Sequence, residues 1–309
     1  MSERVVASAC GVISAAVVAV LAGCSSSPPG PGNVSDLPES SLVEGAYAYP
    51  TEAMEPDPIF AEAQYNAIRQ AIASCMADRG FEYEYRQYRS SPPGRYGVTD
   101  PEQAATWGFR NPASFGGEQD DPDAPPPPQN PQMSPEEEAW TEALSGTEEH
   151  EVAVTGDSGQ VVEQYRADGC SAQGPLSVNP HYFEQRALLQ MLLDLHGRAS
   201  REVEQEPEFQ KAFEEWNRCY SEAGPGPVES LDDYWAGGGL PPDVRTSETI
   251  SQEEIDAAVA SATCLHESGF LRTWSGMLAL AEQRLLDENP GILTEYLEIQ
   301  QNVREELGV

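Results

Sequence analysis

A cysteine followed five residues later by a glycine occurs three times in this 309-residue chain. The three pairs are Cys75 and Gly80, Cys219 and Gly224, and Cys264 and Gly269. Each glycine also ends an amphipathic helical pattern, and glycine closes helix C-termini because it adopts a positive φ without strain. Each of these cysteines is therefore expected about one turn before the end of a helix.

The helical stripes that lead to these cysteines predict which faces are buried. The stripe before Cys75 runs through Ile68 and Ile72, and the stripe before Cys219 ends on Trp216. Both patterns indicate core-facing helices, and Trp216 and Trp274 are expected in the core. The stripe before Cys264 is built from the small residues Ala257, Ala260 and Ser261. Small residues let a second helix come as close as a disulfide requires, at Cα separations of roughly 4.4–6.8 Å.

Together with Cys170, these cysteines form a set of four in the later part of the chain. An even number in an exported chain predicts two disulfides, for which three connectivities exist. The sequence favours Cys75–Cys170 and Cys219–Cys264, because each pair joins neighbours in the chain and brackets a proline-rich loop. The alternative is a metal or redox site at Cys264-Leu265-His266. No C-x-x-C motif occurs, and the thiolates of an exported chain oxidise outside the cytoplasm. We therefore expect no metal and no cofactor.

Export is indicated by the first 24 residues. Arg4 precedes an apolar stretch from Val5 to Leu21, followed by Leu21-Ala22-Gly23-Cys24, which is the pattern of a secretory signal. The stretch of about 17 residues is short for a membrane span of roughly 20. This start resembles that of bacterial lipoproteins, in which the cysteine thiol carries a diacylglyceryl group and the chain is cut before it.

The resemblance implies a signal peptide over residues 1–23, lipidation of Cys24 with further acyl chains such as palmitate, and a place on the extracytoplasmic face of the cell membrane. The alternatives are an uncleaved anchor and a soluble secreted protein. Residues 24–58 are rich in Ser, Pro, Gly and acids, which predicts a disordered tether after the lipidated cysteine.

Residues 59–309 are expected to form one helical domain, interrupted by an irregular proline-rich insert over 90–133. Aromatic residues in the insert predict that its first half packs as an ordered loop, and residues 120–132 are expected to be mobile. The four aromatic residues are Tyr96, Trp107, Phe109 and Phe115.

The remaining patterns are also helical. Capping boxes are expected at Ser134 with Glu137 and at Ser251 with Glu254. Further helical periods cover 181–201, 207–224 and 271–285, and one more starts at 292, whereas 161–165 is ambiguous between strand and helix. The sequence therefore predicts a mainly α fold, a disulfide-stapled helical domain with long proline-rich loops.

The formal net charge of −35 disfavours binding to nucleic acid and to anionic lipid, because phosphate groups repel it. The simplest interpretation of this charge is solubility. The sharper interpretation is attraction of cationic ligands or divalent ions, although no calcium-loop spacing occurs.

No catalytic motif is present in the sequence: a G-x-S-x-G elbow, a P-loop, a dinucleotide fingerprint and H-E-x-x-H are all missing. Among the four histidines, His196 is interpreted as a helix-end residue, and His266 is the best catalytic candidate only by elimination. Tyr182-Phe183 and the alternating Tyr83, Tyr85 and Tyr88 could line a groove, but core packing is favoured. We therefore assign no catalytic residue and do not expect an enzyme.

The cysteine–glycine units resemble uncharacterised lipoproteins of high-GC Gram-positive bacteria. The resemblance rests on Cys75-Met76 with Gly80-Phe81, on Gly169-Cys170 and on two later helices with one cysteine each. Cys219-Tyr220 departs from it, since methionine is expected after that cysteine. The resemblance implies an architecture and no activity.

The function expected from these features is that of a membrane-anchored binding or accessory component of the cell envelope. Its partners would be membrane lipid, through acylated Cys24, and an envelope protein or a transporter. One alternative is the solute-binding lipoprotein of an ABC-type transport system, which normally has two α/β lobes. The other is an extracellular hydrolase, which would need a nucleophile or a metal set.

Overall fold

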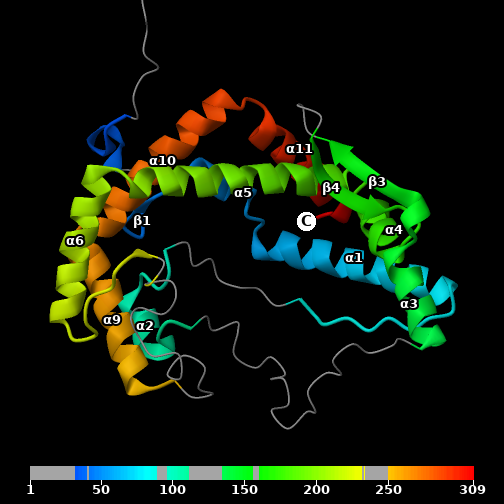
Figure 1. The fold of residues 1–309 in the computed structure, drawn as a ribbon, viewed down its shortest axis with the longest axis horizontal. Coiled ribbons are helices and arrows are strands. Elements are labelled where there is room, and N and C mark those ends of the chain that lie inside the picture. Colours follow the sequence, from blue (N-terminus) through cyan, green and yellow to red (C-terminus); the bar gives the residue numbers. More distant parts are fainter. Residues whose placement is uncertain are drawn as a thin grey trace, which may run out of the picture.

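The structure, a computed structural model, describes residues 32–39, 42–88, 96–110, 134–155, 160–231, 233 and 250–309. Within these residues the fold is mainly α, as predicted, and its only sheets are two antiparallel hairpins (Figure 1). The helices are α1 (Pro58–Asp78), α2 (Pro101–Trp107), α3 (Pro135–Ser145), α4 (Cys170–Val178), α5 (Tyr182–Glu204), α6 (Pro207–Glu222), α9 (Gln252–Glu267), α10 (Phe270–Glu288) and α11 (Ile292–Leu307).

The hairpins are short and lie far apart in the chain. One pairs β1 (Leu42–Val43) with β2 (Ala46–Tyr47), and the other pairs β3 (Glu151–Thr155) with β4 (Val161–Arg166). The segment that was ambiguous in the sequence, 161–165, is thus a strand. Three 3-10 turns complete the described elements: η1 (Val34–Asp36), η3 (Pro50–Met54) and η5 (Glu148–His150).

The three glycines of the cysteine–glycine units have the expected backbone. Gly80, Gly224 and Gly269 have φ values of 87°, 128° and 73°. Each follows directly or closely after the helix that holds its cysteine, namely α1, α6 and α9. The prediction that each cysteine lies near a helix end is confirmed.

Both favoured disulfides are present. Cys75–Cys170 joins α1 to α4 with a Cα separation of 5.6 Å, and Cys219–Cys264 joins α6 to α9 with 5.7 Å. The helices can approach so closely because small residues lie at the crossings. A methyl group on Gly174 of α4, for example, would lie 2.5 Å from the side chain of Ile72.

The disulfides lie at opposite ends of α5, which spans the molecule between α6 and the β3–β4 hairpin (Figure 1). Around α6, α9 and α10 lies the larger core, in which Trp216 is fully buried and Trp274 nearly so, as predicted. A smaller core of Ile72, Met76 and Ala143 surrounds the Cys75–Cys170 disulfide. Each half of the fold therefore has its own hydrophobic core and its own disulfide.

The described part of the proline-rich insert, residues 96–110, packs against the domain. Tyr96 is buried with its ring centroid 4.8 Å from that of Trp274, and Phe109 packs against the larger core. This confirms the ordered first half for those two residues. The prediction of irregular structure is wrong for α2, which begins at Pro101 behind an N-cap aspartate, Asp100. Phe115 and residues 120–132 lie outside the described residues.

The segment expected to be a tether is in part a packed element. Residues 24–31 lie outside the described residues, but residues 42–58 are ordered, so the boundary at 58 is wrong. Tyr47 is 2% exposed, and its N–H donates to Ser275 Oγ of α10 at 2.8 Å. The close approach depends on Gly276, where a methyl group would lie 3.0 Å from the Tyr47 ring and 2.6 Å from the side chain of Val34 in η1.

A fully buried carboxylate, Glu282 of α10, holds this segment in place. The Thr51 N–H donates to it at 3.0 Å and the Thr51 hydroxyl at 2.9 Å. On the opposite side, His196 Nδ1 lies 2.5 Å from the same carboxylate. His196 lies inside α5 and not at a helix end, so that interpretation is wrong, and its role is to bind the buried acid.

The two predicted capping boxes differ. At Ser134 both halves are present, since the Glu137 carboxylate also accepts from the Ser134 N–H. At Ser251 only the hydroxyl caps α9, which it does by accepting from the Glu254 N–H. The Glu254 carboxylate is 1% exposed and instead binds Arg110 of the insert, with one contact at 2.8 Å. The reciprocal half of the second box is therefore replaced by an ion pair between distant segments.

We expect Glu282→Ala to lower the free energy of unfolding by about 3 kcal/mol, because it leaves the buried Thr51 N–H and the half-buried His196 ring without their acceptor. Urea unfolding followed by circular dichroism measures the change. The control is Asp287→Ala, which removes an exposed acid from the same helix and should stay within about 0.5 kcal/mol of the parent. Equal losses in both variants would contradict the assignment.

Candidate functional site

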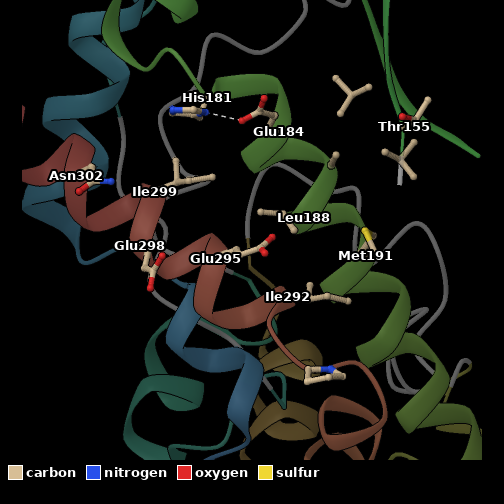
Figure 2. A pocket seen from close by; sticks show the side chains of 14 residues that line it. Thr155, His181, Glu184, Leu188, Met191, Ile292, Glu295, Glu298, Ile299 and Asn302 are labelled. Carbon is tan, nitrogen blue, oxygen red and sulfur yellow. Dashed lines mark hydrogen bonds and ion pairs between the residues drawn. The ribbon is translucent and has the colours of Figure 1, made fainter. Parts of the chain in front are cut away.

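A groove with a volume of about 430 Å³ lies between α5, α11 and the β3–β4 hairpin (Figure 2). Its floor is apolar and comes mainly from the two helices. These floor residues are Ala187, Leu188, Met191, Ile292 and Ile299. Pockets of this size and character are typical of sites for small organic ligands.

The rim of the groove is acidic. Glu184 projects from α5, and Glu295 and Glu298 project from α11, all of them exposed. None of the residues that line the groove is a lysine or an arginine. The one basic group among them, His181, has its Nδ1 2.5 Å from a Glu184 oxygen. Carboxylates around an apolar floor, with no lysine or arginine among the lining residues, favour a ligand that is both positively charged and apolar.

The acidic surface continues along α11. A second hollow of about 440 Å³ shares His181, Ile299 and Asn302 with the groove and adds Glu305 and Glu306. At 1.5 Å per residue, the acids from 295 to 306 cover roughly 16 Å of helix. The site is thus an elongated trough and not an enclosed cavity.

The N-terminal segment holds α11, the wall of the groove. The Met54 carbonyl accepts from the Tyr296 hydroxyl at 3.3 Å and from Gln300 Nε2 at 3.2 Å. Burial raises the pKa of Tyr296, in keeping with a hydroxyl that acts as a donor here. One turn further along α11, Arg304 forms an ion pair with Asp57. The groove therefore depends on the segment that the sequence had assigned to the tether.

The hairpin wall is fixed by an aromatic stack. Tyr165 of β4 lies on Phe183 of α5, with centroids 3.7 Å apart and planes at 4°. Phe183 is buried, which confirms the preference for core packing over a groove at this residue. Its neighbour in sequence, Tyr182, is half-buried and contacts the Phe183 ring edge-on.

The histidines form no common site. Each lies near a different partner: His150 near Asp168, His181 near Glu184, His196 near Glu282 and His266 near Thr99. His266, the catalytic candidate by elimination, has Nε2 at 2.9 Å from the Thr99 carbonyl oxygen. A carbonyl oxygen only accepts, so this nitrogen carries the proton and links α9 to the segment before α2.

The described residues contain no group of three His, Cys, Asp or Glu side chains placed to hold a metal ion. Cys264, the cysteine that was considered as a ligand, is joined to Cys219 in a disulfide. Cys24, the predicted lipidation site, lies outside the described residues. No helix in the described ranges has the length and apolar character needed to cross a membrane.

Sequence reasoning did not find the groove. The acids on its rim carry no signal in a chain with 52 acidic residues, and its apolar floor comes from stripes that also build the core. The one available signal was the run of acids beside isoleucines in the last helix, including Glu295, Glu298 and Ile299. This run becomes informative only once α5 is known to lie opposite.

Comparison of the chain with protein-family models, with curated proteins and with solved structures finds no match.

The Asp57–Arg304 pair should make the attachment of α11 sensitive to acid. Arg304, and then the Phe60 N–H, hold the pKa of Asp57 below its ordinary value of 3.8. A lowered folded-state pKa means that the stabilisation is present above about pH 4 and is lost as the pH falls through the folded-state value. We expect Asp57→Asn to be less stable than the parent near neutral pH, and the gap to close on acidification.

Thermal unfolding of both proteins between about pH 3 and pH 7 measures this gap. Asparagine keeps an N-cap acceptor for α1, so the change isolates the charge. Asp78→Asn, at the exposed far end of the same helix, is the control with the same change in net charge. A gap for Asp57→Asn that is constant over this range would contradict the role of the ion pair.

Proposed function

We propose that this protein is a lipid-anchored binding component of the cell envelope, and that the groove between α5 and α11 binds organic cations with an apolar body. The groove itself carries the proposal. It combines a volume of about 430 Å³ with an apolar floor, and none of the described residues that line it is a lysine or an arginine. The rest of the proposal concerns the attachment of the domain to the membrane through Cys24.

Anchoring through Cys24 is supported by the Leu21-Ala22-Gly23-Cys24 motif and by the apolar stretch before it. The two disulfides are compatible with an oxidising compartment outside the cytoplasm. Two acyl chains on one residue anchor a protein stably, whereas one chain holds it weakly. The domain would then face outward, with the groove open to whatever reaches the membrane surface.

The ligand class follows from charge and shape. A formal charge of −35 attracts cations from a distance and concentrates them near the surface. At the groove, Glu184, Glu295 and Glu298 supply local charge, while Leu188 and Ile299 supply apolar contact. A purely polar cation would leave the floor uncovered, and a neutral apolar ligand would leave the carboxylates without a counter-charge.

The two alternatives receive less support. Two α/β lobes of a solute-binding protein would need alternating strands and helices, and the described residues contain only the hairpins β1–β2 and β3–β4. A hydrolase would need a nucleophile beside a base. The Thr147 hydroxyl lies 2.9 Å from His150 Nδ1, but it also donates to Asp168, and none of these three residues lines the groove. A small-ligand binder without two lobes is what the groove favours.

Calorimetric titration with decyltrimethylammonium, below its micelle concentration, tests the groove. We expect saturable binding to the full chain that weakens about tenfold in the double variant Glu295→Gln/Glu298→Gln, a change of about 1.4 kcal/mol. The matched control is Glu214→Gln/Glu222→Gln, which makes the same charge change at exposed positions of α6. Equal weakening in both variants would show that only net charge attracts the probe, and would overturn the proposal for the groove.

Fractionation of cells tests the anchor. We expect Cys24→Ser to move the protein from the membrane fraction to the medium or to leave it unprocessed, because the thiol carries the lipid. The mass of the purified protein gives an independent readout, since the acyl chains add to it. Unchanged fractionation together with an unchanged mass would contradict lipidation and leave the groove proposal untouched.

A further inference from the structure

Residues 81–88 run back along α1 as an extended stretch that is paired with no strand of the described sheets (Figure 1). The turn into it is made by Gly80, after which the Phe81 N–H donates to the Met76 carbonyl at 3.0 Å. Exposure alternates at its start, with Phe81 and Tyr83 half-buried and Glu82 and Glu84 exposed. This period of two is typical of a β-strand with one face covered.

One backbone edge of this stretch is occupied. The Glu82 carbonyl accepts from Trp140 Nε1 of α3 at 3.0 Å, and the Arg86 carbonyl accepts from the Tyr65 hydroxyl of α1 at 2.7 Å. Both residues are even-numbered. In a strand, the N–H and C=O groups of one residue point to one edge and those of the next residue point to the other.

The opposite edge therefore belongs to Tyr83, Tyr85 and Gln87. In the part of the chain that the structure describes, the backbone groups of these three residues form no hydrogen bond. Their side chains leave the edge open: the Tyr83 hydroxyl accepts from Arg69 at 2.7 Å, and the Tyr83 and Tyr85 rings stack with centroids 6.3 Å apart. The unpaired backbone N–H and C=O groups of these three alternate residues can form hydrogen bonds with another strand.

The surroundings of this edge are acidic where the stretch starts. Glu82 and Glu84 are exposed on the stretch itself. A hollow of about 640 Å³ at its start is lined by Phe81 and Trp140 together with Glu136 and Glu137. An incoming strand would thus meet carboxylates and an aromatic recess where the stretch starts, which suits lysine and arginine side chains at that end, while the exposed Arg86 lies at the other end.

We propose that the 83–87 edge binds an extended, basic segment of a partner protein as an added β-strand. Main-chain hydrogen bonds would supply affinity, and the carboxylates would select the charge of the segment. A second copy of this chain fits less well, because pairing two such edges brings their glutamates together, and like charges on facing strands are destabilising. This surface is separate from the groove and does not depend on its proposed ligand.

The test uses a fluorescent peptide of alternating lysine and valine and the full chain, with binding followed by fluorescence anisotropy in 150 mM salt. We expect Tyr85→Pro to weaken binding at least tenfold, because proline lacks the outward N–H. Tyr85→Thr keeps the N–H and loses only the ring, so it should change the affinity less than threefold. Both variants have the same net charge as the parent, which separates strand pairing from general attraction.

A second probe is the same peptide with every amide N-methylated, which keeps the charge and removes the donors. We expect it to bind at least tenfold more weakly than the parent peptide. Equal affinity of the two peptides, or equal affinity of the Tyr85→Pro and Tyr85→Thr variants, would overturn the proposal. So would sedimentation showing a dimer that Tyr85→Pro dissociates, because the edge would then belong to a second copy. The Glu295→Gln/Glu298→Gln variant should bind the peptide as the parent does, which separates this outcome from the groove.

Discussion

The carboxylate of Glu282 is removed from water at the point where the N-terminal segment, α5 and α10 meet. Burying a charged group is costly unless hydrogen bonds replace its solvation, and here Thr51 and His196 supply them. Thr51 can do so only when the segment before α1 lies across α10. The segment is therefore required to satisfy the core, and through Met54 and Asp57 it also holds α11 and the groove wall.

The disulfides constrain the fold within each half, whereas the Glu282 contacts join separate elements. Each disulfide joins two helices of one half of the fold, with sequence separations of 95 and 45 residues, and the longer loop also contains residues 96–110, which pack against the larger core. The chain-entropy model assigns about 4.7 and about 4 kcal/mol to loops of such lengths, as an upper guide. Neither bridge joins the two halves to each other. The halves are connected by the backbone of α5, which runs from one to the other, and by the non-covalent contacts of α11, the N-terminal segment and residues 96–110.

What the sequence predicted correctly was local. A glycine five residues after a cysteine defines a helix end within one turn, and the disulfide pairs follow from chain neighbours and small-residue crossings. What it missed depended on distant partners: Thr51 binds an acid 231 residues away, and the His196 partner is 86 residues along the chain. Segment 42–58 buries a few residues without any period, and Glu254 matched a capping box but binds Arg110. The groove was missed for the same reason, since its walls come from separate stretches.

The acidic residues divide into two groups with different consequences. Glu254 and Glu282 are buried, and their carboxylates accept hydrogen bonds from Arg110 and Thr51. They therefore stabilise the fold and are not accessible to a ligand. Those on α11 and beside the 83–87 edge are exposed, and net charge alone would explain them as a means of solubility. Their placement argues for more, because they border an apolar trough in one case and unpaired backbone in the other.

Charge on a uniform surface attracts cations without selecting among them, whereas charge beside a second, directional feature selects by shape or by hydrogen bonding. Variants that keep net charge constant while removing the second feature are therefore what separates recognition from attraction in a chain this acidic.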